Sequence, residues 1–354
     1  MVGIDRLGRR PARAPGGIRS QAMSADRRNE VARSERVLPG IWRLRLPCPW
    51  PGVPHVNAWA VSRGDGIVLF DTGIGGEEGV HQLELALGQA QLRLGDVRLV
   101  VCTHAHSDHY GAAGAIVDAA GCELWMHPAW DHIKALADDP ERALDNRIEV
   151  ARRSGVPAAT LARYRARRGE STYLDRAVPP DRELTDGVDV ATDLGFFRAH
   201  ETPGHAPSHV VLHEPESGLL VSGDHLLGRI SLFYDHGHTP DPVAEFIASL
   251  DVVDELDVRL CLPGHGRTFR DVGAKIAAYR KEVEAQLGAV RAALAGGEVT
   301  PFGIVEQMLG PEKASGPAGA WGLQLSLSYL DHLGARGEAE RVAGSDPVLW
   351  RATD

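Results

Sequence analysis

Short apolar runs recur along the first half of the chain and predict a layered arrangement of strands and helices. Residues 41–46 alternate apolar and polar side chains, which is the period of a half-buried strand. Residues 66–70 and 97–102 are apolar runs, and the segment 77–94 between them carries leucines at helical spacing. This strand, helix, strand order is typical of an α/β body. Further strands are expected at 58–61 and 124–126, and a further helix over 111–120.

The rest of the chain divides into stretches of different character. Residues 129–180 are rich in Ala, Arg, Asp and Glu with apolar residues at helical spacing, so we expect a helical insertion there. Residues 188–262 are rich in strand-like runs, including 210–212 and 219–221. Helices are expected over 272–295, 301–309 and 323–333. We therefore predict an arm over residues 1–36, a main α/β domain over 37–271 and a small helical subdomain over 272–354.

Composition is that of a globular protein, with 43% hydrophobic and 24% charged residues in a chain of 354. No run of 18 uncharged apolar residues is present, so we expect no membrane partner. The four cysteines share no CxxC spacing, and two of them lie in apolar strand-like runs. Reduced thiols and a cytoplasmic location are therefore expected. The oligomeric state is left open.

Charge is distributed unevenly along the chain. Residues 1–36 carry nine arginines and four acidic residues but few large apolar side chains, so we expect them to be disordered. They lack the apolar segment of a secretory signal. Because the whole chain has a formal charge of −10, the remainder is acidic, which disfavours nucleic acid as a partner.

Four candidate metal ligands follow the apolar run at 97–102 within six residues. The segment reads HAHSDH and supplies His104, His106, Asp108 and His109. Residues two apart in an extended chain point to the same side, so His104 and His106 can bind one ion while Asp108 and His109 face a second. Burying three imidazoles and a carboxylate together is costly unless cations or hydrogen bonds satisfy them. The pattern therefore predicts a metal site.

Three later segments share one pattern, in which a candidate ligand stands beside a glycine at the end of a strand-like run. They are TPGH ending at His205, SGD ending at Asp224 and LPGHG around His265. Glycine lets the backbone turn sharply next to an ion. Loops at strand ends are common positions for functional groups. Five of the sixteen histidines thus fall in candidate ligand positions.

The succession of Asp71, HAHSDH, PGH, SGD and PGHG resembles the metallo-β-lactamase-fold hydrolases over residues 40–270. The resemblance implies an αββα sandwich of two sheets flanked by helices, with a two-metal site at one edge. It implies a first ion bound by His104, His106 and His205, a second bound by Asp108, His109 and His265, and Asp224 as the bridge between them. Asp71 matches an early aspartate that supports the ligands from behind. The chain is similar to both the glyoxalase II-like branch and a β-lactamase-like endoribonuclease branch, whose small winged-helix-like appendage resembles the tail.

Imidazole and carboxylate ligands without thiolate suit Zn²⁺, and Fe and Mn also accept them. We expect two Zn²⁺ per chain, a metal-bridging hydroxide as the nucleophile, and Asp108 as the catalytic residue that orients it. The insertion is expected to cover the metal edge as a lid, with apolar side chains at Trp130, Ile133, Leu136, Leu161 and Tyr164.

An apolar lid favours small-molecule carboxylic thioesters, esters or lactones as substrates. A metal-dependent endoribonuclease and a non-catalytic metal-binding protein are the alternatives. Tyr234 is expected to be a packing residue. Plain polar roles are expected for His127, His132, His200, His209, His213, His225, His236, His238 and His332.

Overall fold

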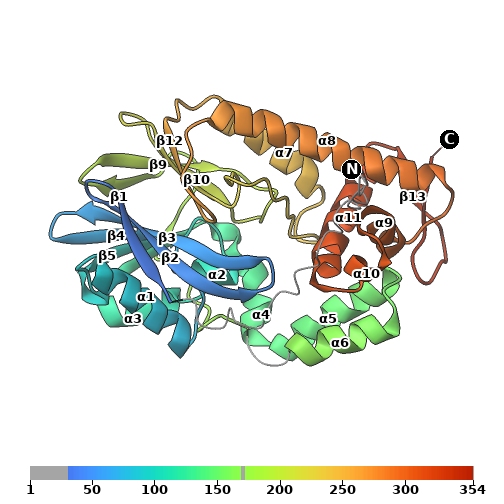
Figure 1. Ribbon diagram of the computed structural model, residues 1–354, viewed down its shortest axis with the longest axis horizontal. Coiled ribbons are helices and arrows are strands. Elements are labelled where there is room, and N and C mark those ends of the chain that lie inside the picture. The colour runs from blue at the N-terminus through green and yellow to red at the C-terminus, as the bar shows by residue number, and fades with distance from the viewer. Residues whose placement is uncertain (1–30, 169–171, 354) are drawn as a thin grey trace, which may run out of the picture. The chain divides into compact units, whose positions relative to one another are not determined.

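The computed structural model describes residues 31–168 and 172–353 (Figure 1). Most of the predicted arm, residues 1–30, lies outside the described residues. The predicted end of the arm at residue 36 is wrong, because strand β1 (Arg33–Leu38) begins before it. β1 pairs antiparallel with β2, where Ser34 lies opposite Leu44. Charged side chains are common on edge strands. They give β1 a composition similar to that of the arm, so composition alone did not separate the two.

Within the described residues, one sheet has seven strands in the order of the sequence. The first four strands are antiparallel neighbours, whereas β4 to β7 run parallel. After β1, these strands are β2 (Ile41–Trp50), β3 (Val53–Arg63), β4 (Gly66–Phe70), β5 (Val97–Val101), β6 (Glu123–Met126) and β7 (Arg182–Glu183).

A second sheet of the described chain has five strands in the order β12-β11-β10-β9-β8. Only β11 and β12 are parallel neighbours in it. The strands are β8 (Asp189–Thr192), β9 (Gly195–Glu201), β10 (Val210–Glu214), β11 (Leu219–Gly223) and β12 (Leu260–Pro263).

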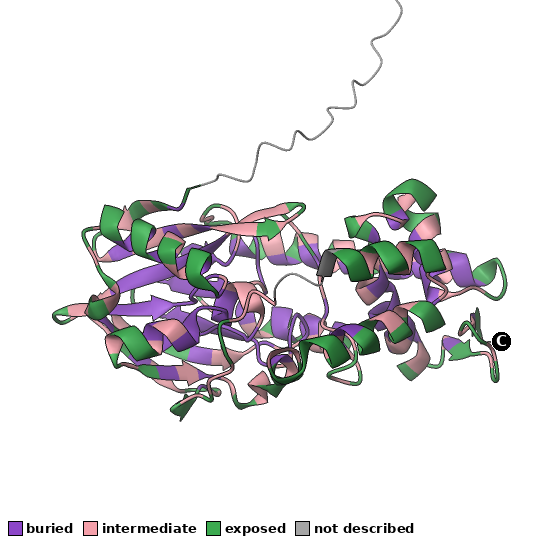
Figure 2. Ribbon diagram, turned by 90° about the horizontal axis from the view of Figure 1, so that it is seen from below, coloured by how far each residue is buried: buried purple, intermediate pink, exposed green. Residues whose placement is uncertain are grey.

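Alternation along the strands builds four layers, as predicted. In β4, Val68 and Phe70 join a core cluster between the two sheets, whereas Ile67 and Leu69 pack in a cluster with α1 (Glu77–Gln89) and α3 (Ala113–Ala120). In β11, Leu220 packs with α7 (Pro242–Asp254) and α8 (Val272–Ala295). Figure 2 shows the strands buried, while the helices expose one face. The αββα sandwich is confirmed.

The helix α7 was not predicted. Residues 188–262 were expected to be strand-rich, yet α7 occupies the connection between β11 and β12. Its start carries an ordinary helix signal, because the Asp241 side chain accepts a hydrogen bond from the Ala244 N–H (2.9 Å) and Pro242 stands at the first helical position. A right-handed crossover between parallel strands commonly contains such a helix.

The predicted helical insertion is present, and three of its apolar side chains pack against the core of the first sheet. It contains a 3₁₀ helix (Pro128–Ile133), α4 (Lys134–Asp138), α5 (Pro140–Arg153) and α6 (Ala158–Arg168). Trp130, Ile133 and Leu136 pack in the core cluster of the first sheet. These three residues therefore contribute to the hydrophobic core, and an apolar pocket formed by the insertion remains a prediction.

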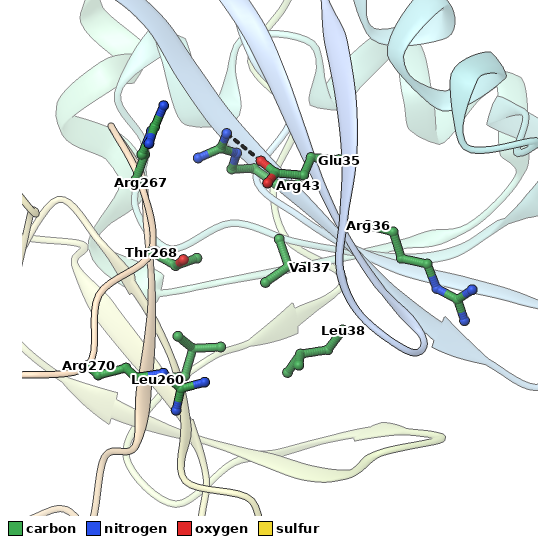
Figure 3. Close-up of a pocket in the computed structure, with 9 residues that line it drawn as sticks. All are labelled: Glu35, Arg36, Val37, Leu38, Arg43, Leu260, Arg267, Thr268 and Arg270. Carbon is green, nitrogen blue, oxygen red and sulfur yellow. Dashed lines mark ion pairs between the residues drawn. The ribbon is translucent and has the colours of Figure 1, made fainter.

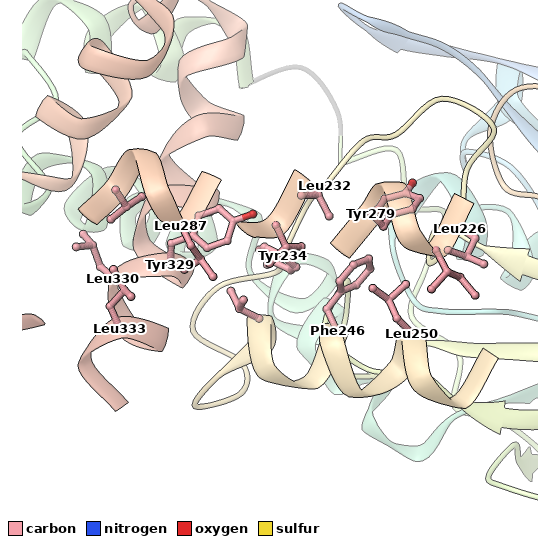
Figure 4. Close-up of a cluster of buried hydrophobic side chains, with 14 of the residues drawn as sticks. Leu226, Leu232, Tyr234, Phe246, Leu250, Tyr279, Leu287, Tyr329, Leu330 and Leu333 are labelled. Carbon is pink, nitrogen blue, oxygen red and sulfur yellow. The ribbon is translucent and has the colours of Figure 1, made fainter. Parts of the chain in front are cut away.

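The tail shares a core with the second sheet. It comprises α9 (Pro301–Leu309), α10 (Pro311–Ala314), α11 (Pro317–Ala335) and the hairpin of β13 (Ala339–Arg341) and β14 (Trp350–Ala352). Figure 4 shows Tyr329 of α11 in the same buried cluster as Tyr234, and Phe246 of α7 beside Tyr279 of α8. The predicted boundary at residue 271 therefore runs through one continuous core, and the described residues from 31 to 353 form one compact unit. No helix among the described residues has the length and apolar character needed to cross a membrane.

Candidate metal centre

The candidate ligands lie in loops that follow strands of both sheets. The HAHSDH segment follows β5, and its last three residues begin the short helix α2 (Ser107–Tyr110), while Asp71 follows β4. His205 follows β9 and Asp224 follows β11, while His265 follows β12. Because β4 and β5 are parallel, and so are β11 and β12, their carboxyl ends meet at one edge of each sheet. All seven predicted ligands are brought together there.

Three imidazoles form the first group. The Nδ1 atom of His106 lies 3.0 Å from Nε2 of His104 and 3.0 Å from Nε2 of His205. Burial and the neighbouring imidazole of His106 lower the pKa of His205 to about 3, and burial lowers the pKa of His104 well below its usual value. Both rings are therefore neutral at pH 7, which is the protonation state that binds a metal.

The second group combines imidazoles with carboxylates. The Nε2 atom of His265 lies 3.4 Å from Oδ2 of Asp108 and 3.2 Å from Oδ2 of Asp224, and Nε2 of His109 lies 3.4 Å from Oδ1 of Asp224. Asp224 also approaches the first group, because its Oδ2 atom is 3.7 Å from Nε2 of His205. Asp224 thus lies between the two groups, as the resemblance implies for a bridging ligand.

The carboxylates of the second group favour positive charge on its imidazoles. Burial lowers the pKa of His265, but the carboxylates of Asp224 and Asp108 outweigh burial and raise it to about 10. Burial raises the pKa of Asp108, but attraction to His109 and His265 lowers it to about 2. These carboxylates attract positive charge to the space between them, where a divalent cation would replace protons of the imidazoles.

The residues present fit a divalent metal ion. The Nε2 atom of His109 and the Oδ1 atom of Asp224 are both buried and lie 3.4 Å apart, and neither makes a hydrogen bond that meets normal geometry with any described residue. A buried polar atom without a partner costs about 1–3 kcal/mol, so natural proteins seldom leave two facing each other. The donors are nitrogen and oxygen, which Zn²⁺, Fe and Mn all accept.

Hydrogen bonds to the ring nitrogens that face away from the candidate metal site fix the orientation of three ligand imidazoles. Asp71 adopts a positive φ of 61°, and its Oδ2 atom lies 2.8 Å from Nδ1 of His109. Its other oxygen, Oδ1, accepts a hydrogen bond from the Thr103 N–H (2.8 Å). Nδ1 of His265 is 2.7 Å from the carbonyl oxygen of His55, and Nδ1 of His104 is 3.0 Å from the hydroxyl of Thr103. A partner on the outer nitrogen leaves the inner nitrogen free to bind metal.

Asp235 and His132 were not predicted to belong to the site. The Oδ2 atom of Asp235 lies 3.4 Å from the outer Nε2 of His106 and 3.2 Å from Nδ1 of His132. The Asp235 N–H also donates to the carbonyl oxygen of His205 (3.1 Å). Asp235 thus contacts two candidate ligands, and His132 brings the insertion to it. Asp235 follows no glycine turn and belongs to none of the recognised segments, so the sequence carried no signal for it.

His209 also has a larger role than the plain polar one expected. Its Nε2 atom accepts a hydrogen bond from the Asp224 N–H (3.1 Å), and its Nδ1 atom lies 2.9 Å from the hydroxyl of Thr202. The spacing of four residues after His205 was the only sign of this contact. His209 therefore holds the turn that carries Asp224.

An aromatic surface borders the first group of ligands. The ring centroid of Phe233 lies 5.7 Å from that of His106 and 5.6 Å from that of His205. The ring centroid of Trp321 in α11 lies 4.8 Å from that of Phe233. The indole N–H of Trp321 donates to the carbonyl oxygen of Leu232 (2.8 Å). Tyr234 is buried in the core, as expected of a packing residue. The apolar surface beside the candidate metal centre thus includes residues from the β11–α7 connection and the tail.

Comparison with known proteins gives a consistent picture. A family model described as the metallo-beta-lactamase superfamily matches residues 51–265. The probable metallo-hydrolase YqjP of Bacillus subtilis is 27% identical over 274 residues, covering 75% of this chain and 83% of YqjP. The acyl-coenzyme A thioesterase MBLAC2 of Bos taurus is 27% identical over 221 residues, covering 61% of this chain and 74% of that protein.

The crystal structure of a beta-lactamase domain protein from Burkholderia ambifaria is also similar. Its TM-score is 0.77 at 29% sequence identity, and the match covers 90% of this chain and 94% of that one. The likeness therefore extends beyond the residues of the family model.

Proposed function

The chain belongs to the metallo-beta-lactamase superfamily as a metal-dependent hydrolase, and we propose that it hydrolyses carboxylic thioesters, with esters and lactones as related substrates, at a two-metal centre. The observation that carries the proposal is the pair of adjoining ligand groups that meet at Asp224. Its Oδ2 atom lies 3.7 Å from His205 of the first group and 3.2 Å from His265 of the second.

In this proposal each group binds one divalent cation, with Zn²⁺ as the expected ion. His104, His106 and His205 would hold the first ion, and Asp108, His109 and His265 the second, with Asp224 shared. When bound, such cations would lower the pKa of a bound water towards about 7 and would polarise the substrate carbonyl. The absence of thiolate from this donor set is compatible with Fe or Mn as well.

The side chains of the chain itself contribute orientation and exclusion of water. Asp108 remains a carboxylate at neutral pH, because its pKa is held near 2 by His109 and His265 after burial has raised it. An ionised carboxylate can accept a hydrogen bond from the attacking water and orient it towards the substrate, which makes Asp108 the expected catalytic residue. The ring of Phe233 lies against the rings of His106 and His205, where its apolar surface would exclude water.

Two further observations support an acyl substrate. Phe233 and Trp321 offer aromatic surface beside the first ligand group, which suits an apolar acyl chain better than a ribose-phosphate backbone. One of the similar proteins, from Bos taurus, is named as an acyl-coenzyme A thioesterase. The net charge of −10 disfavours a long polyanion such as RNA.

Parallel assays of the metal-loaded protein test the proposal. Acyl-coenzyme A thioesters of different chain length, acyl-homoserine lactones and single-stranded RNA are supplied under the same conditions, and metal content is measured by plasma emission spectroscopy. We expect two metal ions per chain and turnover of thioesters. RNA cleavage without thioester turnover would replace the proposal with the endoribonuclease alternative. Full metal content without turnover of any of the three would favour a binding protein.

A further inference from the structure

A cleft lined by arginines lies beside the loop that carries His265. It has a volume of about 470 Å³ and lies between β1, β2 and the segment that follows β12 (Figure 3). Figure 3 shows Arg43 paired with Glu35, while Arg267 and Arg270 lie in the segment that follows β12. None of the candidate metal ligands lines this cleft. The lining residues are Glu35, Arg36, Val37, Leu38, Arg43, Leu260, Arg267, Thr268 and Arg270.

The cleft concentrates positive charge in an acidic protein. Four arginines and one glutamate line it, although the whole chain has a formal charge of −10. Arg43 pairs with Glu35 at 2.6 Å. In the part of the chain that the structure describes, no carboxylate lies within ion-pair distance of Arg36, Arg267 or Arg270. Figure 3 shows the guanidinium group of Arg36 pointing away from those of Arg43 and Arg267, so the excess positive charge of the cleft rests on Arg43, Arg267 and Arg270. Such an excess of positive charge attracts a multivalent anion.

Arg43 shows that this charge is partly desolvated. Its side chain is only 13% exposed. Burial lowers the pKa of Arg43, Glu35 raises it, and the positive charges of Arg45 and Arg267 lower it further. The Nε atom of Arg43 is buried and makes no hydrogen bond to any residue that the structure describes. A counter-anion in the cleft would relieve the repulsion between Arg43 and Arg267.

The cleft is connected to the candidate metal centre through one short loop. Gly266 separates the ligand His265 from Arg267, so about 7 Å of extended chain joins the two residues. The carbonyl oxygen of Gly266 accepts hydrogen bonds from Nη1 of Arg43 (3.1 Å) and from Nδ2 of Asn57 (2.9 Å). Cys261 pairs antiparallel with Phe269, so the segment after Arg267 runs back along β12. An extended substrate held at the metal centre would have to pass this loop to reach the arginines.

We propose that the arginine cleft binds phosphate groups of a thiol carrier whose acyl thioester is hydrolysed at the metal centre. The inference rests on the proposed thioesterase function and names the class of its substrate. Guanidinium groups bind phosphate oxygens through paired hydrogen bonds, which favours phosphate as the ligand of several neighbouring arginines. The leaving group would be a phosphate-bearing thiol, and the acyl chain would lie towards Phe233 and Trp321.

The test compares two thioesters of the same acyl chain. Octanoyl-coenzyme A carries phosphates, whereas octanoyl-N-acetylcysteamine carries none. In the double variant Arg267→Gln/Arg270→Gln we expect KM for the coenzyme A thioester to rise tenfold or more relative to KM for the phosphate-free thioester. Higher salt should raise KM for the coenzyme A thioester in the wild type and have less effect in the variant. Equal changes in KM for both substrates would overturn the inference.

Arg198→Gln is the matched control, because Arg198 is an exposed arginine that pairs with Asp189 on the second sheet, outside the cleft. It should leave the ratio of the two KM values unchanged. If neither thioester is hydrolysed, the proposed function fails, and the cleft is then tested alone. Titration calorimetry with adenosine 3′,5′-bisphosphate should show binding to the wild type and a loss of at least tenfold in the double variant. Equal binding to both proteins would overturn the phosphate site.

Discussion

At the scale of single residues, His106 presents its two ring nitrogens to different groups. Its Nδ1 atom converges with the imidazoles of His104 and His205, and its Nε2 atom lies 3.4 Å from Asp235. A proton held on Nε2 by the carboxylate leaves a lone pair on Nδ1 for a metal ion. Asp235 is thus a positioning residue, which acts on the metal centre through His106.

Replacing Asp235 with asparagine tests this role. Asp235→Asn keeps the shape of the side chain but removes the charge that favours a proton on Nε2 of His106. We expect the affinity for one of the two metal ions to fall by about 10–100-fold, as is typical for such partners of a ligand. Titration against a chromophoric chelator measures it. Asp235→Glu should restore part of the affinity.

Asp331→Asn is the matched control, since Asp331 accepts a hydrogen bond from Nε2 of His236 (2.7 Å) but contacts no candidate ligand. It should leave metal affinity unchanged. Equal losses of affinity in Asp235→Asn and Asp331→Asn would show that Asp235 contributes only to general stability.

Removal of a ligand itself should have a larger effect. In His106→Ala the first group loses the nitrogen on which its other two imidazoles converge, so we expect metal and hydrolysis to be lost together while the fold survives. Emission spectroscopy and circular dichroism measure these outcomes. His81→Ala, which removes an exposed histidine of α1, should change neither. Full metal occupancy in His106→Ala would contradict the ligand assignment.

The residues of the site differed in how far the sequence could predict them. His104, His106 and Asp108 share one short segment, so their spacing alone brought them together. Asp235 and Phe233 lie in a connection without regular spacing, and their contacts with His106 exist only after the two sheets pack. Tertiary contacts of this kind leave no local pattern in a sequence.

At the scale of elements, α7 is held at its start by one side chain with two functions. Asp241 accepts a hydrogen bond from the Ala244 N–H, and its Oδ2 atom lies 2.9 Å from Nδ1 of His332 in α11. The same carboxylate thus caps α7 and joins it to the tail. The sequence contained the Asp-Pro start of this helix, but its apolar residues match a strand-rich stretch as well, so periodicity alone did not identify it.

Asp241→Ala should therefore cost more stability than loss of a cap alone. We expect a decrease of about 2–3 kcal/mol in the free energy of unfolding, of which about 1 is the cap and the rest the hydrogen bond to His332. Asp271→Ala removes the cap of α8 and should cost about 1 kcal/mol, because among the described residues the Asp271 side chain accepts a hydrogen bond from the Ala274 N–H alone. Urea unfolding of both variants measures the difference. Equal losses would show that the contact with His332 adds nothing.

At the scale of the whole molecule, the candidate metal centre exists only when both sheets are packed. Its ligands follow β5, β9, β11 and β12, which belong to different sheets. The resemblance of five short segments was enough to predict this architecture, because their order along the chain is specific to the family. The division of the tail from the main domain could not be predicted, since it depends on how α7, α8 and α11 share one core.

Because the unfolded chain disperses these ligands, metal ions should bind the folded state and stabilise it. At a free metal concentration a thousandfold above the dissociation constant, this linkage is worth about 4 kcal/mol per site. Dialysis against a chelator should therefore lower the thermal midpoint, and addition of Zn²⁺ should restore it. Emission spectroscopy verifies that metal has been removed. Removal also leaves Asp108, Asp224 and their imidazoles without a cation, so the metal-free protein should lose stability first at this edge of the sheets. An unchanged midpoint after complete removal would mean that the seven residues bind no stabilising metal.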